Sequence, residues 1–478
     1  MTQAPLRRPA RAGGHLAIAG AGAAAAFLLL AATVILRPIA PGQFLVLAFL
    51  AGIVGIAAIA ARVAPAWLIS IGILFVPMAG NWELVGVPGT IAPDRVLLLA
   101  GVIATLARVP AVRDLPDPKF RAAHWLFAVY LAYALGSALV VGTLFSDSVF
   151  QLERMGITAL GCFLVAPVAF ARPEDRRILL WCLAGMGAYL GVLAVFEIAA
   201  PGLVVPHFIT DPSIARHLGR ARGPFLEAEL NGFAMFVALV AALVLYANSK
   251  IPRERALALL VVAPCALGIL LTLTRTTWLG AVLGVLVAML VSRQLRPYLL
   301  PAIAAGVLLV IGAFAVIPGL QASASDRANN QGTVYERQNL NRAALNMMLD
   351  LPLTGHGWNR FASVADEFFW QADDYPLGVT KAKVGAHNLL LGIGSELGLI
   401  GIFLWAAGLV AAGWAALTGP IPPELRAWRI GFVAIAVHYA IVVLFTPARH
   451  PYLLLTVLVW AAVAAGPNSL QPRQESRA

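Results

Sequence analysis

Long apolar segments alternate with short polar ones along nearly the whole of this 478-residue chain. A helix that crosses a bilayer needs about 20 consecutive, mostly apolar residues. The third and the last of these segments are short, and either one is compatible with a re-entrant segment as well as a full crossing. The pattern predicts an all-α fold, a polytopic transmembrane helical bundle of about 12–14 spans. The segments are residues 16–36, 43–61, 66–80, 91–107, 124–144, 155–171, 178–200, 230–247, 256–274, 276–292, 298–318, 387–415, 429–446 and 452–466.

The apolar run over residues 256–292 is too long for a single span. As one helix it would extend roughly 55 Å, against a hydrocarbon core of about 30 Å. Its polar break is the stretch from Thr272 to Thr277, which contains Arg275. We therefore expect the chain to turn there, with Arg275 at a membrane surface.

Composition agrees with a membrane protein and narrows the classes of function. Sixty per cent of the residues are hydrophobic and 12% are charged, whereas soluble domains have about 25% charged residues. The net charge of +11 is spread over short loops without a basic, aromatic-rich face, so no nucleic-acid partner is expected. The cysteines lie inside apolar runs, without metal-site or disulfide spacing, and no nucleotide-binding motif is present. They are Cys162, Cys182 and Cys265.

The loop charges predict an orientation, because cytoplasmic loops of membrane proteins carry an excess of Lys and Arg. With a cytoplasmic N-terminus, the basic clusters at 108–121, 172–177, 250–255, 293–296 and 426–429 all lie in the cytoplasm. Both termini are then cytoplasmic, as an even number of spans requires.

Several basic residues lie against that bias, in short loops on the other side of the membrane. Anion binding is the leading reason to place positive charge there. For any single one, a snorkelling or interfacial side chain is the alternative. The residues are Arg216, Arg220, Arg222, Arg275, Arg449 and His450.

One long extramembrane segment, residues 319–386, divides the chain into three parts. Residues 1–318 form an N-terminal bundle of about eleven spans, and residues 387–478 form the C-terminal transmembrane helices and a cytoplasmic tail. Residues 335–351 have apolar positions near helical spacing, which predicts an amphipathic helix over the bundle or along the interface. A loop of this length is more often a lid or binding loop than a spacer. Its arginines are candidate substrate contacts, although a solvated helix face explains them equally well: Arg337, Arg342 and Arg360.

His387 and Asn388 lie where this loop re-enters a membrane span. Imidazole titrates near neutrality, so His387 is a candidate to accept or orient a hydroxyl proton. The alternative is a histidine that hydrogen-bonds a loop carbonyl. Asn388 is a further candidate substrate contact, although a helix N-cap is the favoured interpretation. Glu396 lies nine residues further on in apolar sequence and needs a partner. We favour a structural role, as a partner of a neighbouring helix, over the alternative that it shares a proton with a catalytic group.

Four motifs over roughly residues 210–415 resemble the O-antigen ligase and polymerase superfamily, which includes exopolysaccharide polymerases. The pair of His387-Asn388 and Glu396-x-Gly398-x-x-Gly401, after a long loop, is fairly specific, whereas each arginine motif alone is weak. The other three are Arg220-Ala-Arg222-Gly223-Pro-Phe225 with Asn231, Thr272-Leu-Thr-Arg275-Thr-Thr-Trp278-Leu-Gly280, and Gly355-His-Gly357-x-x-x-Phe361.

The resemblance implies an integral-membrane glycosyltransferase of the bacterial inner membrane with its active site facing the periplasm. The donor would be a glycan on undecaprenyl diphosphate. The acceptor would be a sugar hydroxyl, on lipid A-core for a ligase or on another lipid-linked glycan for a polymerase, and both remain open. The expected reaction is independent of metals, needs no cofactor and inverts the anomeric centre. The oligomeric state is not predicted.

In such a site, guanidinium groups would stabilise the diphosphate, because they are planar, always charged and bidentate to phosphate. We expect Arg275 in this role, together with Arg222 or Arg220. The alternative function is a multi-span transporter of a small anion or a lipid-linked saccharide. Transporters typically have paired, interrupted helices in two halves, and the halves of this chain do not mirror each other.

Overall fold

The computed structural model describes residues 62–87, 92–108, 120–143, 152–214, 219–317, 332–369, 385–446 and 450–469, together with 321, 322 and 325. Within these residues every regular element is a helix, which confirms the predicted all-α fold. The expected spans 16–36 and 43–61, and the residues Arg216 and Arg449, lie outside the described residues.

Each expected span from 66–80 onward coincides with a helix over most of its length. Within the described part, seven helices are long and apolar enough to cross a membrane, namely α5, α8, α9, α10, α12, α16 and α17, and shorter apolar helices include α3, α7, α11 and α18. The helices are α3 (Pro65–Phe75), α4 (Pro93–Arg108), α5 (Ala122–Val140), α7 (Thr158–Ala169), α8 (Pro173–Ala199), α9 (Ala228–Asn248), α10 (Pro252–Leu271), α11 (Arg275–Val291), α12 (Leu299–Val316), α14 (Gly332–Asp350), α15 (Phe361–Val364), α16 (Leu389–Leu417), α17 (Arg426–Phe445) and α18 (Pro451–Ser469).

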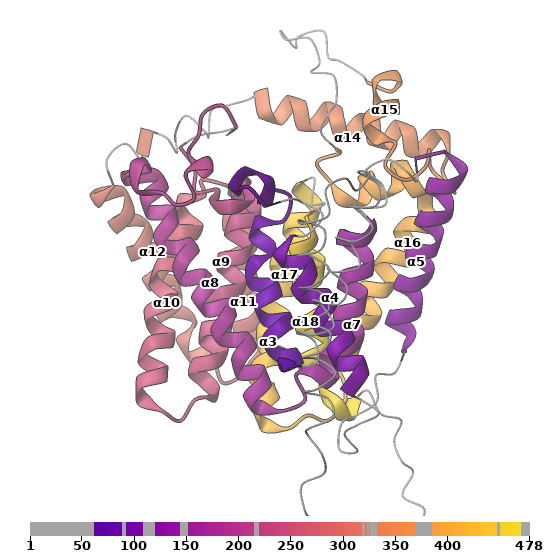
Figure 1. Cartoon of the computed structure of the whole chain (residues 1–478). Helices are drawn as coiled ribbons and strands as arrows, with labels where there is room; N and C mark the ends of the chain where they lie inside the picture. Colours follow the sequence, from indigo (N-terminus) through magenta and orange to yellow (C-terminus); the bar gives the residue numbers. More distant parts are fainter. Residues whose placement is uncertain are drawn as a thin grey trace, which may run out of the picture.

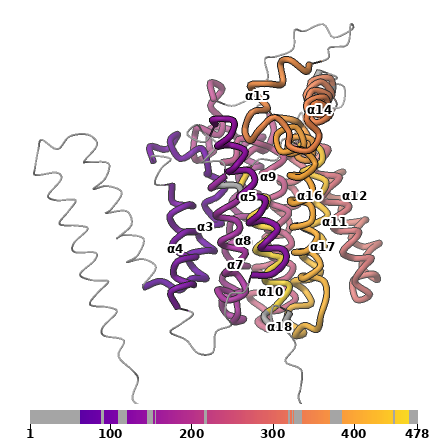
Figure 2. The backbone as a smooth tube through the Cα atoms, turned by 90° about the vertical axis from the view of Figure 1, so that its right-hand side faces the viewer, coloured from indigo at the N-terminus to yellow at the C-terminus, as the bar shows by residue number. Residues whose placement is uncertain are grey.

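The amphipathic helix predicted over 335–351 is α14, which lies across one end of the bundle (Figure 1). Figure 2 shows α14 and α15 above the same end from the side. The apolar face of α14, including Leu340 and Met347, packs against Phe361 and Val364 of α15. We call the end of the bundle that α14 covers the α14 end, and the other end the opposite end.

The turn expected at the polar break is present, because α10 ends at Leu271 and α11 begins at Arg275. This turn lies at the α14 end, whereas the connection from α9 to α10 lies at the opposite end (Figure 1). A single helix over this stretch would have extended far beyond the hydrocarbon core.

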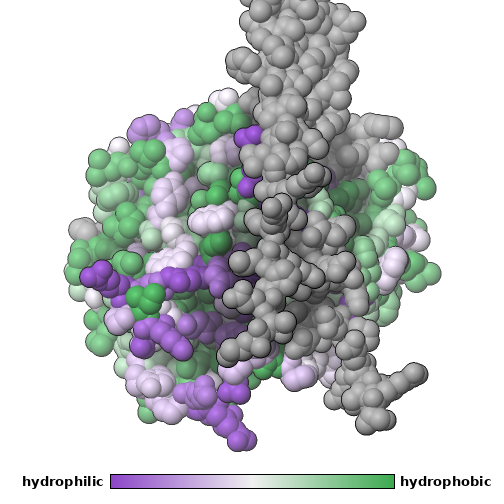
Figure 3. Space-filling model, turned by 60° about the horizontal axis from the view of Figure 1, so that its bottom comes forward, coloured by the Kyte–Doolittle hydropathy of each residue, from purple (hydrophilic) through white to green (hydrophobic). Residues whose placement is uncertain are grey.

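Burial separates central helices from peripheral ones. In α9, 83% of the apolar window is buried, and this helix packs against α8, α10 and α17. In α12 only 6% is buried, so nearly all of its apolar surface is exposed. A helix that is apolar on all sides and so exposed is stable in lipid. Figure 3 shows hydrophilic residues gathered toward the opposite end, beside apolar residues.

Helices from before and after the long loop pack together in one bundle. α11 packs against α17, α7 against α18, and α5 against α16. The α11–α17 contact is close because Gly280 has no side chain: a Cβ there would lie 2.4 Å from the ring of His438. That buried ring contacts Phe233 and Phe236 of α9 edge-to-face, with centroids 5.4 and 4.5 Å away.

Candidate functional site

Arg220 and Arg222 lie on the connection that leads into α9, residues 219–227, which we call the arginine loop. Three hydrogen bonds donated by its backbone N–H groups hold this loop in place. The N–H of Ala221 donates to the carbonyl of Leu271 at 3.0 Å. The N–H groups of Arg222 and Gly223 donate to the two carboxylate oxygens of Glu197, each at 2.9 Å. The loop is therefore held to the ends of α8 and α10.

The two arginines of this loop differ in burial. Arg222 is only 2% exposed, and its Nη2 donates to the carbonyl of Ile209 at 2.5 Å. Burial lowers the pKa of Arg222, and the nearby Glu197 carboxylate partly opposes that shift. Arg220 is only half-buried. Arg222 thus contributes to the packing of the loop, whereas Arg220 is the more accessible of the two.

Gly223 explains the Gly…Asn part of the arginine motif. Its φ is +56°, and a Cβ there would lie 2.5 Å from Oδ1 of Asn231. The Nδ2 of Asn231 donates to the carbonyl of Ala221 at 3.2 Å. Only glycine allows this asparagine to reach the loop backbone.

Arg275 is the first residue of α11 and is exposed at the α14 end. The turn before it is held by side chains: the Thr274 hydroxyl donates to the Thr272 carbonyl at 2.9 Å, and the Trp278 indole donates to the carbonyls that end α10. Because Leu271, four residues earlier, accepts from Ala221, the arginine loop and the Arg275 turn adjoin. The structure thus places the arginines of the two predicted motifs on neighbouring loops.

His387 and Asn388 precede α16 at the same end. The Asn388 side chain accepts from the N–H of Leu391 at 3.1 Å, which is the expected N-cap. Burial, and secondarily the charge of Arg337 on α14, lower the pKa of His387 to about 4. Its Nδ1 is buried and has no hydrogen-bond partner in the described part of the chain. His387 is therefore neutral near pH 7.

No described contact joins the other two arginines of the long loop to His387. Arg342 is exposed on α14, and Arg360 is half-buried at the start of α15. Arg337 is the one whose charge reaches His387. Within the described residues, no three His, Cys, Asp or Glu side chains are grouped as metal ligands would be.

α16 is interrupted at Gly398, where φ is 64° and ψ is −164°. The loop 352–357 runs beside this break and replaces the lost intrahelical hydrogen bonds, because polar backbone in apolar surroundings must be paired. Its own Gly355 has a φ of +64°, and a Cβ there would lie 2.4 Å from the backbone of Glu396. The replacing bonds are His356 N–H to Ser395 O at 2.9 Å, Gly357 N–H to Glu396 O at 2.8 Å and Leu399 N–H to Pro352 O at 2.8 Å.

The carboxylate of Glu396, only 1% exposed, accepts from the N–H of Phe361 at the start of α15 at 3.1 Å. This contact agrees with the structural role that the sequence favours for Glu396. Glu396 also lines a small cavity of about 40 Å³ together with Trp358 and His450, large enough to hold water.

His450 connects this cavity to the arginine loop. Its ring contacts Phe225 of that loop edge-to-face, with centroids 5.1 Å apart, and its Nδ1 accepts from the N–H of Tyr452 at 3.2 Å. The sequence indicated His450 only as one of several basic residues placed against the charge bias, and it did not predict Glu197 as a site residue. The signal for His450 was its place in a basic turn against the charge bias, and the signal for Glu197 was a lone carboxylate in an apolar run.

Residues 260–406 match the family described as O-antigen ligase. The matched segment begins within α10 and extends into α16, so it contains the Arg275 turn, the long loop, His387 and Glu396, but not the arginine loop. A comparison with curated proteins found no match. Over residues 260–406 the chain is therefore similar to the O-antigen ligase family, and this segment lies within a helical membrane bundle.

Proposed function

We propose that the protein transfers a glycan from undecaprenyl diphosphate to an acceptor sugar hydroxyl at the periplasmic face of the bacterial inner membrane. The α14 end is then periplasmic, and both termini are cytoplasmic. The observation that carries the proposal is the hydrogen bond from Ala221 to Leu271, which joins the two arginine-bearing loops at the end where His387 lies. Ligase and polymerase differ in the acceptor, and the same geometry serves either.

In this proposal Arg275 and Arg220 bind the diphosphate, because both are accessible at adjoining loops of the α14 end. The buried Arg222 holds the loop through Ile209 and adds positive charge behind it. Negative charge develops on the diphosphate as its bond to the sugar breaks, and fixed guanidinium groups stabilise that charge best away from bulk water. This chemistry needs no metal or cofactor.

His387 orients the acceptor hydroxyl and takes its proton as the hydroxyl oxygen attacks the anomeric carbon. The diphosphate leaves from the opposite side with the bonding electrons, so the configuration inverts. A neutral imidazole with an unpartnered Nδ1 suits this role. Its low pKa makes it a weak base, and we therefore assign more of its effect to orientation than to proton affinity.

The test is surface-glycan assembly in cells that carry Arg275→Ala, Arg220→Ala or His387→Ala in place of the native protein. We expect Arg275→Ala and His387→Ala to abolish assembly, while membrane insertion and protein level stay unchanged. Arg253→Ala, an exposed arginine at the opposite end, is the matched control and should assemble normal glycan. Normal glycan from both active-site variants would refute the proposal.

The glycan that accumulates separates the two activities. Lipid-linked glycan stalled at one repeat unit, seen on a gel, indicates a polymerase. Long lipid-linked chains that are not attached to lipid A-core indicate a ligase.

A further inference from the structure

A larger cavity lies at the opposite end of the bundle, away from the arginine loop and His387. Its volume is about 340 Å³, within the range of about 300–1,000 Å³ that is typical of small-molecule sites. It lies between the first turns of α8, the connection from α9 to α10, and the start of α17. This end comes forward in Figure 3, where hydrophilic residues lie beside hydrophobic ones.

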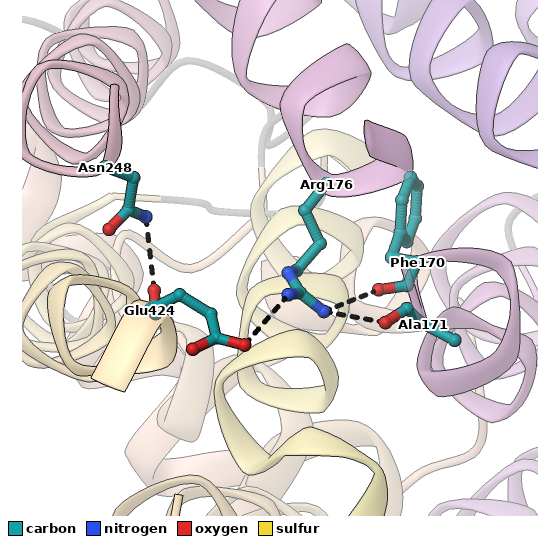
Figure 4. Close-up of polar contacts among 5 residues, drawn as sticks. All are labelled: Phe170, Ala171, Arg176, Asn248 and Glu424. Carbon is teal, nitrogen blue, oxygen red and sulfur yellow. Dashed lines mark hydrogen bonds and ion pairs between the residues drawn. The ribbon is translucent and has the colours of Figure 1, made fainter. Parts of the chain in front are cut away.

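Arg176 fixes one wall of this cavity (Figure 4). This side chain is 6% exposed, and its Nη1 donates to the carbonyls of Phe170 and Ala171 at 3.3 and 2.8 Å. Its Nη2 lies 3.9 Å from the Glu424 carboxylate, and Asn248 donates to the Glu424 carbonyl at 3.1 Å. These contacts hold α8 and α9 against the segment before α17, so this wall of the cavity is fixed in position.

The charged side chains of the cavity are not all paired with one another. Arg176 pairs with Glu424, and Arg177 pairs with Glu254, whose other oxygen accepts from the Ser249 hydroxyl at 2.8 Å. Two lining side chains remain without a hydrogen bond or a close ion pair within the described residues, although the Glu174 carboxylate also interacts electrostatically with Arg176. They are the ammonium of Lys250 and the carboxylate of Glu174.

This remaining charge selects the class of ligand. An anion would be attracted by Lys250 and repelled by Glu174, so it gains little. A ligand that carries both a phosphate and an ammonium group pairs with both side chains. The charge left in the cavity is therefore complementary to a zwitterion.

An apolar surface continues from the rim of the cavity. Ile251 is exposed at the rim, and Leu257 and Leu260 are exposed on α10, one and two turns beyond Glu254. Residues three apart on a helix lie on neighbouring parts of its surface. A polar cavity beside an apolar helix face suits an amphiphile better than a soluble zwitterion.

We propose that this cavity binds the headgroup of a zwitterionic phospholipid, with its phosphate at Lys250, its primary ammonium at Glu174 and its acyl chains along α10. The proposal is independent of the transfer reaction. In the orientation proposed above, the lipid belongs to the cytoplasmic leaflet.

The test is lipid retention by the purified, delipidated full-length protein, measured by native mass spectrometry after exposure to vesicles. The vesicles contain phosphatidylethanolamine, phosphatidylcholine or phosphatidylglycerol. We expect phosphatidylethanolamine to be retained preferentially, because the methylated ammonium of phosphatidylcholine cannot donate hydrogen bonds. Lys250→Gln and Glu174→Gln should each lower its retention roughly fivefold. Both side chains are exposed, so neither change should disturb folding, which the elution volume checks.

Arg253→Gln and Glu83→Gln are matched controls, because both residues are exposed and neither lines the cavity. They should leave retention unchanged. Equal retention of phosphatidylethanolamine and phosphatidylcholine, or unaltered retention by both cavity variants, would overturn the proposal. Preferential retention of phosphatidylglycerol would also overturn it, because the occupant would then be an anionic lipid and not a zwitterionic one. Equally strong competition by soluble glycerophosphoethanolamine would show that the acyl chains do not contribute and would reject a lipid occupant.

Discussion

The carboxylate of Glu197 accepts a hydrogen bond from the backbone N–H of Arg222 at 2.9 Å, and its second oxygen accepts from the next residue at the same distance. Glu197 is near the end of α8, so a membrane helix positions the arginine loop through its backbone. A buried carboxylate that accepts two such bonds is costly to replace, because both donors would lose their partner.

We expect Glu197→Gln to lower the free energy of unfolding by roughly 1–3 kcal/mol, because an amide has one oxygen and its NH₂ group would face the second N–H donor. The thermal midpoint of the detergent-solubilised protein measures this loss. Glu229→Gln, on the first turn of α9, is the control, since within the described residues Glu229 makes no hydrogen bond to the loop. An unchanged midpoint for Glu197→Gln would show that the loop does not depend on this contact.

Gly398→Ala should destabilise the protein, because φ is +64° at this position and the new Cβ would lie 2.2 Å from the Leu353 carbonyl oxygen. Backbone strain of this kind costs roughly 1–3 kcal/mol before the clash is counted. Gly413→Ala in the same helix is the matched control, because its nearest neighbour would be 3.8 Å away, and it should be neutral or stabilising. If both variants melt at the same temperature, the break in α16 is not needed for the fold.

Asn388→Ala should cost about 1 kcal/mol, the usual value of an N-cap, because the Leu391 N–H loses its acceptor. Asn388→Asp and Asn388→Ser keep an acceptor and should restore most of the stability and full glycan assembly. Thermal melts and a glycan gel measure the two quantities. Failure of Asp and Ser to support assembly in a stable protein would instead indicate that the amide contacts substrate.

The pKa of about 4 for His387 predicts a pH dependence of stability. An unfolded histidine has a pKa of about 6.5, so below that pH the unfolded state binds more protons than the folded state. The stability contributed by the neutral imidazole is complete above pH 6.5 and is lost as the pH falls toward 4, on the order of 3 kcal/mol in all. His387→Gln removes this pH-dependent contribution to stability. The thermal midpoint of the variant should therefore fall less steeply than that of the native protein between pH 6.5 and 4. Parallel curves would contradict the lowered pKa.

The spans within the described residues were predictable because an apolar segment of suitable length forms a helix independently of its neighbours. The turn at Arg275 was predictable for a similar reason, since a 30 Å hydrocarbon core does not accommodate a continuous helix over 256–292. The N-cap role of Asn388 depends on residues three positions apart, so it too could be inferred locally.

The partners of Glu197, Glu396 and His450 could not be predicted. The contact from Glu197 to Arg222 joins residues 25 positions apart, and Phe361 and Glu396 are 35 apart. Apolar periodicity shows which segments are helices but not which of them are neighbours. The burial of Arg222 could not be predicted from the sequence either, because the residues around a loop arginine do not show whether its side chain faces water or a backbone carbonyl.

The sequence by itself determined that this is a helical membrane protein, where its helices turn, and which motifs resemble the O-antigen ligase and polymerase superfamily. These follow from hydrophobicity, helix length and short spacings, all of which act within one segment. Only the tertiary structure decided that the arginine loop adjoins the Arg275 turn, that loop 352–357 completes the broken α16, and that Lys250 and Glu174 line one cavity without a close ion pair among the described residues. Those relationships depend on which helix ends meet, and packing across the whole bundle sets that.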